Sequence, residues 1–115
     1  MKIIRSKNEN ISVKEKYLMS MNPEIRHMRD AEGMNVPVLN WMLYVDRDKE
    51  GNEKTLLSIL SEDNVAYATN SRTFIESFDT LCDMFADSGE EITAIKVIGG
   101  QSKSARHFIT CAYAE

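Results

Sequence analysis

The sequence predicts one mainly β domain with a single main helix, which places it in the α+β class. Its 115 residues are 43% hydrophobic and 28% charged, which suits one modest core in a single domain spanning residues 1–115. From residue 39 onward, short apolar segments alternate with turn-forming residues, and one segment has a helical period instead. No apolar run approaches the roughly 18 residues that cross a membrane, and the N-terminus lacks the apolar stretch of an export signal. We therefore expect a cytoplasmic protein without a membrane partner.

Residues 1–35 have the weakest patterns in the chain. Residues 1–10 are polar and predict a loose arm. The segment Ile11–Ser20 alternates in part between apolar and polar residues, which predicts a first strand. An Asn-Pro pair then opens Met21–Gly33, which predicts a short helix or an ordered loop. Whether residues 1–35 complete a barrel or remain an arm stays open.

The middle of the chain predicts a meander of three strands, Leu39–Asp46, Thr55–Leu60 and Val65–Thr69. Alternation in the first strand places Trp41 on one face and Tyr44 on the other. A charged segment with a Gly-Asn pair joins the first two strands, and a Glu-Asp-Asn turn joins the next two.

The main helix is predicted over residues 71–87. Ser71 can cap its first turn, and Gly89 provides a C-terminal stop. The apolar stripe has spacings of four, three and four residues and consists of Phe74, Phe78, Leu81 and Phe85.

Two further strands follow the helix, Ile92–Ile98 and His107–Tyr113, with a flexible turn at Gly99–Ser104 between them. The order after residue 39 is therefore β-β-β-α-β-β. A partly open five-stranded barrel of the OB type has this order, with its helix between the third and fourth strands. A meander backed by one helix has the same order, so both folds stay open.

The charge is unevenly distributed along the chain. The formal net charge is −4, from 14 Lys and Arg against 18 Asp and Glu. Residues 62–91 hold eight acids against Arg72 alone, a balance of −7. This segment predicts a solvated acidic helix face, or a surface for a basic partner.

The cysteines do not form a catalytic pattern. Cys82 lies on the apolar stripe of the helix, where a thiol packs as a small hydrophobe. Cys111 and His107 share a strand face, but four residues of strand separate them by roughly 13 Å. We expect structural cysteines and no enzyme.

No metal or cofactor site is predicted. His27 and His107 are the only histidines, and neither has a neighbour at ligand spacing. Residues 46–51 imitate the start of an EF-hand loop, but position twelve is Leu57, where a glutamate is required.

Aromatic and basic side chains on the predicted strands indicate nucleic-acid binding. A single-strand groove needs flat faces for bases and cations along the backbone path. The candidate faces are Trp41, Tyr44, Tyr67, Phe108 and Tyr113, of which we select the first three. The candidate cations are Arg47, Lys54, Arg72, Lys96, Lys103 and Arg106, of which we select the last four for phosphate contacts.

Three segments resemble a known family. They are the closing stretch Ile95–Cys111, the central block Tyr67–Phe78, and the opening Val13–Tyr17. They are similar to small single-stranded-DNA-binding-like proteins of conjugative transposons and phages of Gram-positive bacteria. The resemblance implies an OB-like fold and a role in DNA processing during element transfer or replication.

These patterns together predict a non-enzymatic single-stranded DNA-binding protein of a bacterial mobile genetic element. The alternative is a protein-protein interaction module, an adaptor or host-factor inhibitor, that binds no nucleic acid and uses the acidic helix 71–87. Homo-oligomer formation through a sheet edge stays open, as does a preference for DNA or RNA.

Overall fold

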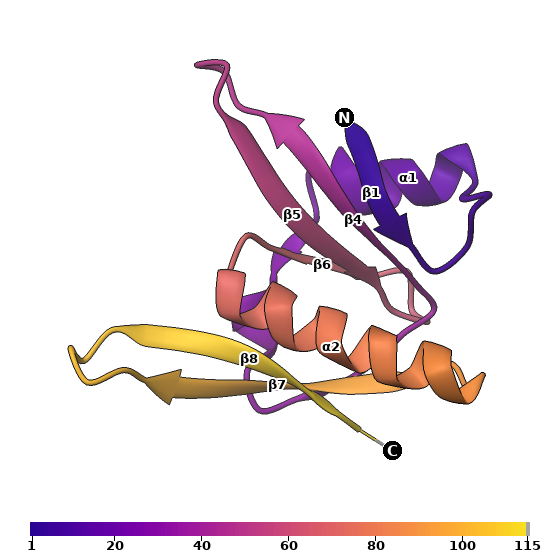
Figure 1. The fold of residues 1–115 in the computed structure, drawn as a ribbon. Coiled ribbons are helices and arrows are strands. Elements are labelled where there is room, and N and C mark those ends of the chain that lie inside the picture. The colour runs from indigo at the N-terminus through magenta and orange to yellow at the C-terminus, as the bar shows by residue number, and fades with distance from the viewer. Residues whose placement is uncertain (115) are drawn as a thin grey trace.

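The structure is a computed structural model that describes residues 1–114 (Figure 1). The elements are β1 (Lys2–Ser6), α1 (Val13–Ser20), β2 (Arg26–His27), the 3₁₀ helix η1 (Met28–Ala31), β3 (Asn35–Pro37), β4 (Asn40–Arg47), β5 (Glu53–Leu60), β6 (Ala66–Thr69), α2 (Arg72–Ser88), β7 (Ala94–Gln101) and β8 (His107–Tyr113). A five-stranded sheet has the order β1-β4-β5-β6-β2, and a three-stranded sheet has the order β3-β7-β8. The predicted α+β class is confirmed. Neither α-helix in residues 1–114 is long and apolar enough to span a membrane.

The predicted meander is confirmed as β4, β5 and β6, and the five-stranded sheet is covered on both faces. Trp41 and Leu57 belong to a central core that α2 and the three-stranded sheet share. Met42, Tyr44 and Leu60 point the other way, into a smaller core beneath α1. Burial on both faces explains why β4 and β5 have apolar residues at consecutive positions.

Two N-terminal expectations were wrong. Residues 2–6 form β1, which pairs antiparallel with β4, so this segment is no loose arm. Residues 13–20 form helix α1 and not the strand that partial alternation predicted. Ser12 caps this helix, because its hydroxyl accepts a hydrogen bond from the Glu15 N–H at 3.1 Å.

The segment Met21–Gly33, for which we predicted a short helix or an ordered loop, contains a short strand and a 3₁₀ helix. Strand β2 pairs in parallel with β6, with Arg26 opposite Tyr67. The 3₁₀ helix η1 follows at once and buries Met28 and Ala31 in the central core. This anchoring holds the polar residues between them at the surface.

Helix α2 confirms the predicted main helix. Ser71 caps it by accepting a hydrogen bond from the Phe74 N–H at 3.3 Å, and Gly89 ends it with a φ of 76°. That left-handed conformation favours glycine. The ring of Phe78 meets Trp41 edge to face, with centroids 5.1 Å apart, so the helix is fixed on the central core.

The predicted flexible turn at residues 99–104 was wrong in its position. Gly99 and Gly100 belong to β7, and the turn to β8 lies at residues 102–106. A Cβ on Gly99 would lie 1.6 Å from a carboxylate oxygen of Glu32, and one on Gly100 would lie 2.8 Å from the ring of Phe108. The glycines therefore make space for two side chains and are not a hinge.

The two sheets do not close into the expected OB-like barrel. The outer edge of β8 faces α2, and side chains of that helix satisfy its backbone. Thr73 donates its hydroxyl to the Ile109 carbonyl at 2.7 Å, and the Cys111 N–H donates to the Ser77 hydroxyl at 2.8 Å. These two backbone groups are therefore occupied by α2 and are not available to pair with the other sheet.

Candidate nucleic-acid interface

A groove of about 500 Å³ lies between the β4–β5 and β7–β8 hairpins, which diverge on either side of the N-terminal end of α2 (Figure 1). Its lining includes three cations and two histidines but no Asp or Glu. The cations are Arg26, Arg29 and Lys54, and the histidines are His27 and His107. In a chain with a formal net charge of −4, this groove is a local concentration of positive charge.

The pairing of β2 with β6 places the basic residues along one wall. Arg26 and His27 lie in β2, and Arg29 lies in the 3₁₀ helix that continues from it. All three are exposed. Lys54 stands on β5, and a neighbouring hollow shares Lys54 with the groove and is also lined by Arg72 and Glu76. Arg29 in η1, Lys54 on β5 and Arg72 at the start of α2 thus line two hollows that share lining residues.

The N-terminal end of α2 adds to this positive potential. Asn70 and Ser71 line the groove directly. The first turn of this 17-residue helix holds no acidic residue. The N-terminus of a helix carries about half a positive charge, so it attracts anions.

One carboxylate contacts a residue that lines the groove from β8. Glu32 lies 2.9 Å from Nε2 of His107, and both side chains are about 40% exposed. Gly99 permits this contact, because a side chain there would collide with Glu32. The negative charge of Glu32 lowers the positive potential on the β8 side of the groove.

The three selected aromatic side chains lie in the two cores. Trp41 and Tyr67 are each 8% exposed in the central core, and Tyr44 is 2% exposed beneath α1. The Tyr44 hydroxyl contacts the Ser58 hydroxyl at 3.3 Å, and burial raises its pKa. Stacking on these rings requires access to their faces. Their role in binding stays a prediction.

The selected cations occupy three places. Arg72 starts α2 and forms an ion pair with Glu76 at 3.1 Å. Lys103 and Arg106 are exposed in the turn at the tip of the β7–β8 hairpin. Lys96 pairs with Asn35 and Ala112 within the three-stranded sheet, away from the groove lining. The structure thus places Arg72 beside the groove and leaves Lys96 apart from it.

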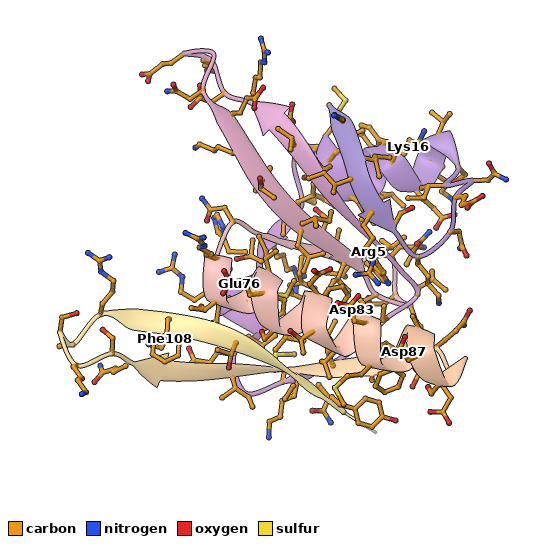
Figure 2. All side chains as sticks on the ribbon, in the orientation of Figure 1. Arg5, Lys16, Glu76, Asp83, Asp87 and Phe108 are labelled. Atoms are coloured by element: carbon orange, nitrogen blue, oxygen red, sulfur yellow. The ribbon has the colours of Figure 1, made fainter. Side chains whose placement is uncertain are left out.

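The remaining candidate faces lie on β8. Phe108 contributes to the groove wall and is half-buried, with its ring against Gly100. Figure 2 shows its place on this hairpin. Tyr113 packs its ring against Phe85 at the far end of the strand, with centroids 5.1 Å apart.

The cysteines are buried and poorly ionised. Burial raises the pKa of Cys82 to about 11 and that of Cys111 to about 12. A thiolate is the reactive form, so these thiols are poor nucleophiles. Among residues 1–114, no group of three or more His, Cys, Asp or Glu could hold a metal ion.

Sequence reasoning missed most of the groove. Lys54 was among the candidates, but Arg26, His27, Arg29 and His107 were not considered as ligands of nucleic acid. The only local signal was the cluster of basic and histidine residues from 26 to 29. Its partners across the groove come from segments far along the chain.

One comparison with known proteins gives a match. The model of a family described as phage single-stranded DNA-binding protein matches residues 19–113. No curated protein and no solved structure matches the chain. The matched segment includes the whole groove, from β2 to β8. The chain belongs to the phage single-stranded DNA-binding protein family.

Proposed function

We propose that this chain binds single-stranded DNA in the groove between its two hairpins. The observation that carries the proposal is the groove lining, which has three cations and two histidines but no carboxylate. Phosphates repeat along a single strand, so a row of cations matches its backbone. Arg26, Arg29 and Lys54 contact the phosphates within the groove.

The strand continues beyond both ends of the groove. Arg72 contacts it beside the start of α2, and Lys103 and Arg106 contact it at the tip of the β7–β8 hairpin. The half-buried side chains of Ile25 and Leu56, which line the groove, supply apolar surface for the bases. A duplex hides the faces of its bases, so this arrangement favours a single strand.

In this proposal the protein is not an enzyme. It is encoded by a phage or a bacterial mobile element and acts in the cytoplasm. The raised pKa values of both cysteines argue against catalysis by a thiol nucleophile.

A specific observation favours one competing function, a protein-interaction module that binds no nucleic acid. The three aromatic side chains first selected for stacking are all buried. The acidic residues of α2 would be its binding surface.

Fluorescence anisotropy of a labelled oligo-dT strand, titrated at low and at moderate salt, decides between the two. We expect saturable binding that weakens as salt rises, and weaker binding to a duplex of the same length. A flat titration at low salt would overturn the proposal and leave the interaction module.

A further inference from the structure

Helix α1 exposes a line of apolar side chains on its solvent side. Val13 is 82% exposed, Tyr17 is 48% exposed and Met21, the C-cap residue, is 77% exposed. They are spaced four residues apart, so they lie along one face. Met19, on the opposite face, is fully buried against the five-stranded sheet. Single exposed apolar residues are ordinary, but three in a row on one helix form a patch.

Two lysines border this patch. Lys14 and Lys16 follow Val13 at positions that fall on either side of the apolar line. Neither forms an ion pair within residues 1–114. We call the five residues Val13, Lys14, Lys16, Tyr17 and Met21 the α1 patch. It has an apolar centre and a positively charged border.

The C-terminal end of α2 has the opposite composition. Met84 is 62% exposed, and the acids around it are Asp83, Asp87 and Glu90. Asp83 forms an ion pair with Arg5 at 2.9 Å, and Arg5 also pairs with Asp79. Asp87 and Glu90 form no ion pair within residues 1–114. Figure 2 shows Asp83 and Asp87 along this half of the helix. We call these four residues the α2 end.

The two surfaces lie on different sides of the molecule. Helix α1 covers one face of the five-stranded sheet, and α2 packs into the central core on the other face (Figure 1). Two copies can therefore join with the α1 patch of one against the α2 end of the next. Such a head-to-tail contact leaves one free surface at each end, so further copies can add.

We propose that a second copy of this chain occupies the α1 patch, through its α2 end. The argument is charge complementarity: each surface has exposed apolar atoms at its centre, and the borders carry opposite charges. Residues 13–18 lie outside the segment that the family model matches, whereas Met21 and the α2 end lie within it. The proposal does not depend on DNA binding.

The contact is small, which sets its strength. An eight-residue helix is only about 12 Å long, so the surface is well below the roughly 800 Å² per partner of a stable interface. We therefore expect weak association of the free protein that salt reduces further. Neighbouring copies on one strand would be held at millimolar effective concentration, where a weak contact is occupied.

The test uses two charge-reversed variants of the full chain. Lys14→Glu with Lys16→Glu makes the α1 patch negative, and Asp87→Lys with Glu90→Lys makes the α2 end positive. Each variant alone brings like charges together. In an equal mixture, both kinds of contact join opposite charges. The negative α1 patch of the first variant meets the positive α2 end of the second, and the unchanged α1 patch of the second meets the unchanged α2 end of the first.

Sedimentation velocity at low salt, over a range of concentrations up to about millimolar, gives the readout. We expect the weight-average sedimentation coefficient of the wild-type protein to rise with concentration. Each variant alone stays at the monomer value, and the mixture rises again. The substituted side chains are at least partly exposed, and circular dichroism checks that both variants fold.

A third variant tests the apolar part of the contact. Tyr17→Ser, which leaves every charge in place, is expected to reduce the association as well. If the wild-type protein stays monomeric, the proposal is overturned and a different protein is the better occupant of these surfaces. Association that persists in both charge variants, or a mixture that stays monomeric, overturns it too.

Binding of a short oligo-dT strand, measured on the same samples, keeps the two proposals separate. Loss of association with unchanged binding of the short strand places the contact outside the groove. If the protein binds no DNA at all, the proposed function is contradicted. The self-association proposal is still tested, because it is measured by sedimentation of the free protein.

Discussion

Removal of two groove cations gives the sharpest test of the proposed binding path. Arg26→Ala combined with Arg29→Ala is the change, because both side chains are exposed and line the groove. Neither forms an ion pair within residues 1–114, so their loss leaves no carboxylate without its partner. The backbone pairing of Arg26 with Tyr67 does not need the side chain. We expect the fold to be retained and DNA binding to weaken.

The magnitude follows from counterion release. Each phosphate contact on a single strand contributes about 0.7 to the slope of log K against log salt. Two lost contacts lower that slope by about 1.4. If the variant and the wild-type protein have equal affinities at 1 M salt, the variant binds about 25-fold more weakly than wild type at 0.1 M salt and about 5-fold more weakly at 0.3 M salt.

The assay is fluorescence anisotropy with an oligo-dT strand of about 15 nucleotides, which holds one copy or few. The matched control is Lys2→Ala with Lys49→Ala, which removes the same charge from exposed residues of β1 and of the turn between β4 and β5, outside the groove lining and the α1 patch. We expect less than a twofold change in affinity for the control. Equal losses in both variants would mean that net charge alone acts, and no loss in the groove variant would refute the path.

Three other predictions concern single features. Glu32→Gln removes the carboxylate 2.9 Å from His107, so single-strand affinity at low salt is expected to rise about twofold in the same titration. A weaker complex would show that the carboxylate organises the wall instead. Because the pKa values of the two cysteines are raised from about 9 to about 11 and 12, iodoacetamide at pH 8 should modify them at least about 100-fold more slowly in the folded protein than in denaturant. The same shifts predict that unfolding free energy falls between pH 9 and pH 12, since the unfolded chain loses these protons first; a flat profile there contradicts the burial. Ser58→Ala removes a buried hydroxyl that donates to the Met19 carbonyl at 2.6 Å, and should lower the free energy of unfolding in urea by about 1–3 kcal/mol. A loss below about 0.5 kcal/mol would mean that another donor replaces it.

Local patterns predicted the elements that have strong periodicity. The stripe of Phe74, Phe78 and Phe85 and the cap at Ser71 placed α2 within a residue or two of its bounds. Helix α1 was mistaken because its apolar residues lie on two faces, and Val13 and Tyr17 imitate a strand. The pattern Ser12-x-x-Glu15 is a helix-start signal that outweighs this alternation.

The same limit applies to the candidate site. Trp41 and Tyr44 on opposite faces of one strand indicate a sheet buried on both sides. A strand of this kind offers few rings to a ligand, so the alternation itself argues against stacking there. The groove depends on long-range contacts, because Arg26 reaches it only through pairing with Tyr67, which lies 41 residues further along the chain. No local pattern encodes such a contact.

The acidic balance of the chain is compatible with a polyanionic ligand because the charges are segregated. Asp87 lies 15 residues beyond Arg72 on the same helix, a separation of about 22 Å along its axis. The Debye length is about 8–10 Å at ordinary salt, so the acids at this end scarcely affect the groove.

The position of those acids nevertheless costs stability. The C-terminal end of a helix carries partial negative charge, so Asp87 in the last turn is repelled there, whereas a lysine would be attracted. We therefore expect Asp87→Lys with Glu90→Lys, the variant that should abolish self-association, to raise Tm by about 1–4 °C in a thermal melt at low salt. Asp63→Lys with Glu62→Lys, in the exposed turn before β6, is the matched control and should leave the association intact. A lower Tm in the α2 variant would show that these acids support the helix locally. A higher Tm together with lost association would mean that these acids destabilise the helix through its dipole but are needed for the contact with another copy.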